Sequence, residues 1–142
     1  MPPRNARYAR DDGERILVSM RVVADVLVVL VAVLHLLFLV LEMFLWTKPF
    51  GRRTFGLSRE LAGATKGLAA NQGLYNGFLA AGLIWGVTGG DAAFAIKVFF
   101  LSCVIVAGIF GAVTAKRSIL FVQALPGLLA LIAVLVTNGA IR

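Results

Sequence analysis

Apolar residues gather in four long runs that are separated by short polar or basic stretches. The runs cover about residues 22–46, 68–88, 92–115 and 119–138. Each run reaches or approaches the roughly 20 residues that a helix needs to cross a bilayer. Because only a few residues join the last three runs, neighbouring helices have to run in opposite directions. The pattern therefore predicts an all-α membrane protein, in which residues 22–142 form an antiparallel bundle of four transmembrane helices.

Composition argues against the main alternative, a soluble helical bundle. Hydrophobic residues make up 60% of the 142-residue chain, and its mean hydropathy of +0.91 is too high for an ordinary soluble domain. Residues 1–21 are different, because they contain five arginines and three acidic residues. We expect them to form a disordered or loosely helical tail on the membrane surface. No small-residue cleavage site follows the first run, so we expect the tail to stay attached.

The second run carries polar side chains in its first turns. On a helical wheel that starts at Gly73, they share one arc of roughly 160–300°: Asn71, Gln72, Tyr75 and Asn76. Gly73, Gly77 and Ala81 form a stripe of small residues at roughly 0–80°. Amides in hydrocarbon are costly unless they are hydrogen-bonded, so we expect the polar face to look into protein. The small stripe predicts a close contact with a neighbouring helix.

The first run holds an internal acid and the chain's one histidine. His35 and Glu42 are seven residues apart and therefore share one face of the helix. Antiparallel packing places Glu42 at the depth of Asn71 and Gln72, about one turn from the loop that joins the two runs. The candidate ligand-binding residues then form a ladder that leads inward from this loop: Glu42, Asn71, Gln72, Tyr75, Asn76 and His35.

The net charge of +7 comes mainly from residues outside the apolar runs. Arg52, Arg53 and Arg59 of the first loop are the predicted contacts to anionic lipid head groups. No basic domain or aromatic-basic motif accompanies them, so nucleic acid is not expected as a partner. Inside the first run, Asp25 lies one helical turn from Arg21, and we expect these two to form a local ion pair.

The distribution of charge also predicts the orientation in the membrane. Loops one and three together carry seven basic residues: Lys48, Arg52, Arg53, Arg59, Lys66, Lys116 and Arg117. The opposite side has as many, but five lie in or beside the tail, where acidic residues offset part of the charge. We therefore expect a multi-pass membrane protein with loops one and three on the cytoplasmic side.

Residues suited to metal or nucleophilic chemistry are scarce. Cys103 is the only cysteine and His35 the only histidine, which leaves a metal site short of ligands. A haem held by two histidines would need two chains. We expect no metal and no cofactor. No nucleophile beside a base is visible, so the sequence favours a protein that is not an enzyme.

Two segments carry a resemblance to a known family. They are the Leu-Glu-Met-Phe-Leu-Trp string that ends at Trp46 and the Ala-Asn-Gln-Gly-Leu-Tyr-Asn-Gly string that ends at Gly77. Over about residues 22–138 the chain resembles domain of unknown function 1304, a family of small bacterial four-helix membrane proteins. The resemblance implies this fold and a location in the bacterial inner membrane, but no activity. Members often carry a glutamate before the histidine and a tyrosine two residues after it, where this chain has Leu34 and Leu37.

Three interpretations of the polar ladder stay open. In the first it binds a small molecule or a lipid head group, and the protein is a proton-coupled carrier that forms a homodimer to enclose a path. In the second the polar groups only fix helix packing, and the protein is a structural or accessory membrane subunit. In the third it is an intramembrane enzyme acting on a lipophilic substrate, with His35 and Tyr75 as acid and base.

Overall fold

The computed structural model describes the backbone of residues 4–141 and the side chains of residues 11–140. Every regular element in this part of the chain is a helix, which confirms the all-α prediction. In order, the elements are α1 (Arg4–Met43), α2 (Pro49–Phe55), α3 (Arg59–Ala64), α4 (Lys66–Thr88), the 3₁₀ turn η1 (Gly90–Ala92), α5 (Ala93–Thr114), the π-helical turn η2 (Leu120–Ala124) and α6 (Leu125–Ile141).

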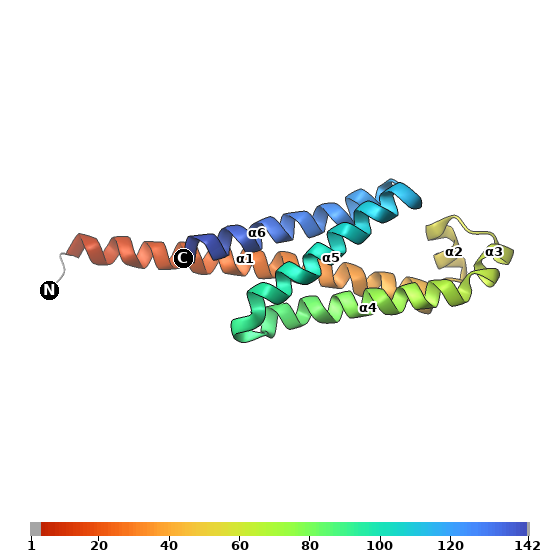
Figure 1. Cartoon of the computed structure of the whole chain (residues 1–142), viewed down its shortest axis with the longest axis horizontal. Helices are drawn as coiled ribbons and strands as arrows, with labels where there is room; N and C mark the ends of the chain where they lie inside the picture. Colours follow the sequence, from red (N-terminus) through yellow and green to blue (C-terminus); the bar gives the residue numbers. More distant parts are fainter. Residues whose placement is uncertain (1–3, 142) are drawn as a thin grey trace.

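The four long helices form a closed set of neighbours. α1 packs against α4 and α6, and α5 also packs against α4 and α6. Successive long helices run in opposite directions, and α5 crosses diagonally from the last turns of α4 to the start of α6 (Figure 1). The short helices α2 and α3 lie at the end of the molecule where α5 turns into η2 and α6 (Figure 1). We call this end, which carries the basic residues of loops one and three, the basic end.

Of the two forms expected for residues 1–21, a disordered or a loosely helical tail, the structure has a helix from Arg4 onward. α1 begins there and continues without a break through the first predicted span to Met43. No proline interrupts this stretch, and Asp11 and Arg15 have the four-residue spacing that favours a helix. Residues 1–3 and 142 lie outside the described part of the chain.

Three helices among the described residues are long and apolar enough to cross a membrane: Asp11–Met43, Gly90–Thr114 and Leu120–Ala140. The predicted fourth span, α4, is not among them, because amides and Lys66 lower the hydropathy of its first half. Its 23 residues nevertheless give a length of about 35 Å at a rise of 1.5 Å per residue. The structure thus has three span-like helices and a fourth helix of comparable length.

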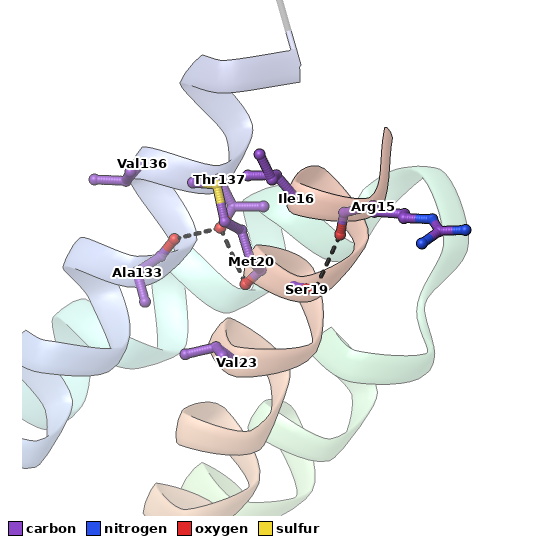
Figure 2. A pocket seen from close by; sticks show the side chains of 8 residues that line it. All are labelled: Arg15, Ile16, Ser19, Met20, Val23, Ala133, Val136 and Thr137. Carbon is purple, nitrogen blue, oxygen red and sulfur yellow. Dashed lines mark hydrogen bonds between the residues drawn. The ribbon is translucent and has the colours of Figure 1, made fainter. Parts of the chain in front are cut away.

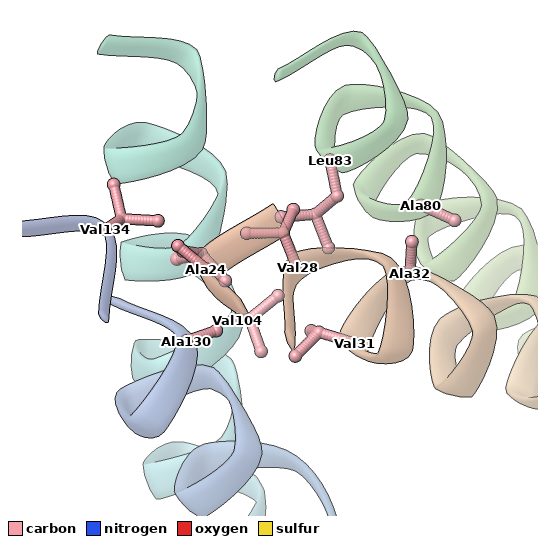
Figure 3. Close-up of a cluster of buried hydrophobic side chains, with 10 residues drawn as sticks. Ala24, Val28, Val31, Ala32, Ala80, Leu83, Val104, Ala130 and Val134 are labelled. Atoms are coloured by element: carbon pink, nitrogen blue, oxygen red, sulfur yellow. The ribbon is translucent and has the colours of Figure 1, made fainter. Parts of the chain in front are cut away.

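Side chains from all four long helices meet in a core at the middle of the bundle (Figure 3). Val28 and Val31 of α1, Leu83 of α4, Val104 of α5 and Ala130 of α6 are each at most 2% exposed. Small and branched residues at such a contact let helices approach closely and gain dispersion energy over a large area. The core therefore holds the four helices together at the centre of the bundle. Toward the two ends, α5 packs against different helices.

The contacts of α5 explain this difference between the ends. A Cβ added at Gly82 of α4 would collide with the Phe100 ring of α5, so the two helices touch there. Further along α5, a Cβ added at Gly108 would lie 2.7 Å from the backbone nitrogen of Ala124, so α5 then packs against η2. α5 thus covers the second half of α4 and moves away from its first half (Figure 1).

Candidate functional site

Glu42 and Asn76 meet across the contact between α1 and α4. The Asn76 Nδ2 atom donates a hydrogen bond of 2.8 Å to Glu42 Oε2. Asn76 is 5% exposed, and Glu42 is half-buried. Of the expected ladder, this is the contact that the structure forms. A carboxylate can accept about four hydrogen bonds, so Glu42 keeps acceptor capacity beyond the one bond to Asn76.

Two glycines of α4 make this contact possible. A Cβ added at Gly73 would lie 2.6 Å from Met43 Cγ, and one added at Gly77 would lie 2.7 Å from Leu39 Cδ1. The absence of side chains at both positions lets α4 lie directly on the last turns of α1. The predicted close contact is confirmed for Gly73 and Gly77. It is wrong for Ala81, which is exposed.

His35 lies deeper along the same face of α1, about 10 Å from Glu42 at 1.5 Å per residue. The side chain is 1% exposed, and its Nδ1 atom lies 2.8 Å from the carbonyl oxygen of Val31. Because a carbonyl only accepts, Nδ1 must carry a proton and donate it. In the neutral ring, Nε2 is then an acceptor, and it is buried without a hydrogen-bond partner among the described residues. Such a buried unpaired atom is unusual in a native structure.

Asn71, Gln72 and Tyr75 do not join this contact. Both amides are exposed, and Tyr75 is 56% exposed. The helices of the same chain therefore do not cover this part of the polar face, and the expectation that it looks into protein stays a prediction. The reason lies in the path of α5: Gly82, seven residues after Tyr75 and on the same helical face, is covered by α5, whereas the first half of α4 is not.

The loop between α1 and α4 is folded onto the basic end. Gly51 of α2 packs against the backbone of Leu45, and the Trp46 Nε1 atom donates a hydrogen bond of 3.0 Å to the Thr65 hydroxyl. Ser58 caps the N-terminus of α3, since its hydroxyl accepts a hydrogen bond of 3.1 Å from the Leu61 N–H. The loop is therefore a defined structure that fixes where its basic residues lie.

The three arginines proposed for head-group contact differ in their surroundings. Arg53 and Arg59 are exposed, whereas Arg52 is half-buried and its Nε atom is buried without a hydrogen-bond partner. Glu60 is the nearby acid. Hydrogen bonds from its own backbone N–H and from Ser58, together with the charge of Arg52, lower the pKa of Glu60. Glu60 thus stays ionised among the basic residues at neutral pH.

Asp25 and Lys97 form an ion pair that the sequence analysis missed. The Lys97 Nζ atom lies 2.7 Å from Asp25 Oδ1, and the two side chains are 15% and 37% exposed, respectively. The stem of Lys97 passes over Gly86 of α4, where an added Cβ would lie 2.7 Å from Lys97 Cγ. The expected local pairing of Asp25 with Arg21 is replaced by a link between α1 and α5. Opposite charges placed inside two separate spans were the available signal.

An open groove of about 450 Å³ lies away from Glu42, between the first turns of the apolar part of α1 and the end of α6 (Figure 2). Its lining is almost entirely apolar and consists of Arg15, Ile16, Ser19, Met20, Val23, Ala133, Val136 and Thr137. The Thr137 hydroxyl donates to the Ala133 carbonyl at 2.8 Å and lies 3.4 Å from the Met20 carbonyl. The groove holds none of the predicted site residues. Among the described residues, no three His, Cys, Asp or Glu side chains lie together as metal ligands would.

Comparison with known proteins identifies the family. Residues 29–135 match the model of a family described as protein of unknown function, DUF1304. The chain belongs to the DUF1304 family. It is similar to the uncharacterized protein YpaA of Lactococcus lactis subsp. lactis (strain IL1403), with 28% identity over 116 residues that cover 80% of this chain and 98% of YpaA. No solved structure matches the chain. The part that matches the DUF1304 model contains His35, Glu42 and Asn76 as well as the loop at the basic end.

Proposed function

We propose that the chain is an integral membrane protein in which α4 is a fourth span. Connectivity supports this topology. α1 ends at the basic end, whereas α5 begins at the opposite end (Figure 1), so α4 has to carry the chain across the thickness that α1, α5 and α6 span. α4 is long enough to do so and packs against both α1 and α5.

The proposed orientation has the basic end in the cytoplasm of a bacterial cell. All seven basic residues of loops one and three belong to this end, as the positive-inside rule requires. In a Cys103→Ala background, we expect a cysteine at Gly90 to react with a membrane-impermeant thiol reagent in intact cells. A cysteine at Arg53 is expected to react only after the cells are opened. Labelling of position 53 in intact cells would overturn the orientation.

We further propose that Glu42, Asn76 and His35 form an intramembrane site for a small molecule or a lipid head group. The unpartnered Nε2 atom of the buried His35 is the observation that carries this proposal. A buried polar atom left without a partner costs about 1–3 kcal/mol, which a ligand or water would offset. Both Nε2 and the carboxylate of Glu42 are acceptors, so the site favours a ligand with hydrogen-bond donors, such as an amine. If the protein is a proton-coupled carrier, Glu42 or His35 is the group that binds the proton.

The basic end supplies the complementary charge for such a ligand. An aminophospholipid head group carries an ammonium group, which matches Glu42, and a phosphate, which matches exposed guanidinium groups such as those of Arg53 and Arg59. Glu42 lies one residue before the end of α1, next to the loop that carries these arginines. We therefore propose an aminophospholipid head group as the first ligand to test.

The contact between Glu42 and Asn76 also fits the second interpretation, in which polar groups only fix helix packing. A hydrogen bond between α1 and α4 would set their register whether or not a ligand binds. The enzyme interpretation has less support. His35 is 1% exposed while Tyr75 is 56% exposed, so the proposed acid and base do not share a surface.

Glu42→Gln separates these interpretations because it keeps the hydrogen-bond acceptor for Asn76 and removes the charge. We expect the variant to fold normally and to retain at least about tenfold less phosphatidylethanolamine in native mass spectrometry, the equivalent of one lost charged hydrogen bond. Glu60→Gln is the matched control, since it removes an exposed carboxylate at the same end. Equal lipid retention by wild type and by Glu42→Gln would leave only the packing role.

A further inference from the structure

We propose that two copies of this chain pair in the membrane through an exposed stripe on the first half of α4. The stripe consists of Leu68, Asn71, Tyr75 and Phe78, with Gln72 beside Asn71. Leu68 is 75% exposed, and Tyr75 and Phe78 are each 56% exposed. The inference rests on the proposed membrane location, because only there does an uncovered polar face need a protein partner.

The polar groups of the stripe lack partners within the described part of the chain. No hydrogen bond from the side chains of Asn71 or Gln72, or from the Tyr75 hydroxyl, occurs there; Tyr75 makes only a ring contact with Phe78. These groups lie five to nine residues past Lys66, or about 8–14 Å into the helix. Lipid tails offer no hydrogen bonds at that depth, so exposure to lipid would leave both amides unsatisfied.

The spacing of the stripe is that of a helix-pairing seam. The steps from Leu68 to Asn71, to Tyr75 and to Phe78 are three, four and three residues, which are the a and d positions of a heptad repeat. These steps place Asn71 at a d position, so its amide lies within the seam. An amide inside a membrane also hydrogen-bonds readily to an amide on a neighbouring helix.

A second copy is the partner that fits this face. The stripe carries no charged side chain, so two identical faces meet without charge repulsion. Each amide both donates and accepts, which makes the face complementary to itself across a two-fold axis. The fold also leaves room for a neighbour here. The Phe100 ring of α5 covers Gly82, which lies on the same face one heptad after Tyr75, whereas no helix of the same chain covers the stripe.

Cysteine cross-linking tests the pairing in vesicles of the full chain. In a Cys103→Ala background, we expect Tyr75→Cys to form disulfide-linked dimers on mild oxidation, because a seam position meets its counterpart in the second copy. Leu37→Cys is the matched control, since Leu37 is 54% exposed on α1 and lies near the same depth but on another helix. Equal cross-linking at both positions would show random encounters and overturn the proposal, as would the absence of dimers at position 75.

A second measurement does not depend on cross-linking. Single-molecule photobleaching in vesicles should show dimers of the wild type. The double variant Asn71→Leu/Gln72→Leu loses the amide contacts, so it should need about tenfold more protein per membrane area to form the same fraction of dimer. The pairing is overturned if the wild type is monomeric and retains lipid head groups on the stripe of α4. That failure is distinct from failure of the proposed function, which would appear as alkaline extraction of the chain from membranes or as unchanged lipid retention in Glu42→Gln.

Discussion

Gly73→Leu is expected to destabilise the bundle by roughly 1–3 kcal/mol, the usual range for an overpacked contact. Even a Cβ at this position would lie 2.6 Å from Met43 Cγ and 3.2 Å from the carbonyl oxygen of Leu39. The Leu39 backbone belongs to α1 and cannot move without moving the helix, so α4 has to shift outward. That shift would also lengthen the hydrogen bond between Asn76 and Glu42, which lies within one turn of Gly73.

Thermal unfolding in detergent measures this effect, and Gly67→Leu provides the control. Gly67 belongs to the same helix, but a Cβ added there meets nothing within 4 Å. Both variants change glycine to leucine in α4, so the helix propensity gained is similar and cancels in the comparison. We expect Gly67→Leu to unfold at or above the wild-type temperature and Gly73→Leu to unfold clearly below it. Equal melting temperatures for the two variants would contradict the close contact of α4 with α1.

The helices were predictable because long apolar runs leave a chain few choices. Each predicted run overlaps one of the long helices over most of the run, since 20 or so apolar residues without an internal break favour a helix in any setting. The tail was less predictable. Its charges left disorder and a loose helix both open, and their helical spacing and the absence of proline between Pro3 and Met43 let α1 extend back to Arg4.

The candidate site was predictable only where its geometry depends on the contact between α1 and α4 alone. Gly73 and Gly77 select the face of α4 that meets α1, but the predicted depth was about one turn off: it placed Asn71 and Gln72 beside Glu42, whereas the structure places Asn76 there. The environment of Asn71 and Tyr75 depends instead on the path of α5, which packs against α4 at Gly82 and against η2 further along. A helical wheel of α4 alone contains no information about that path, so it could not distinguish a contact with α5 from a contact outside the chain.

The pairing of Asp25 was missed for a related reason. Arg21 lies one turn away on the same helix, and local pairs are the first that a sequence suggests. In the structure the partner is 72 positions away along the chain, on α5, because the stem of Lys97 fits over Gly86. A charged pair inside two predicted spans is thus better predicted from depth than from sequence separation, since an unpaired charge in hydrocarbon costs several kcal/mol.

Lys97→Met is expected to destabilise the protein by roughly 1–3 kcal/mol, less than the 3–5 kcal/mol typical of a fully buried pair. Methionine keeps an unbranched stem over Gly86, so the main loss is the ammonium group that lies 2.7 Å from Asp25. Asp25 then faces an apolar surface without its partner, and its partial exposure accounts for the reduced cost. The free energy of unfolding, measured separately for the wild type and for the variant in mixed micelles, gives the difference.

The double variant Asp25→Asn/Lys97→Met decides whether the loss belongs to the pair. Asparagine is neutral and close in shape, so the second change removes the charge that Lys97→Met leaves unpaired. We expect the double variant to be destabilised by at least about 1 kcal/mol less than the sum of Asp25→Asn and Lys97→Met measured singly, a coupling within the range found between residues in direct contact. If the effects of the two single changes simply add, the ion pair makes no net contribution, and the link between α1 and α5 at this end rests on packing around Gly86.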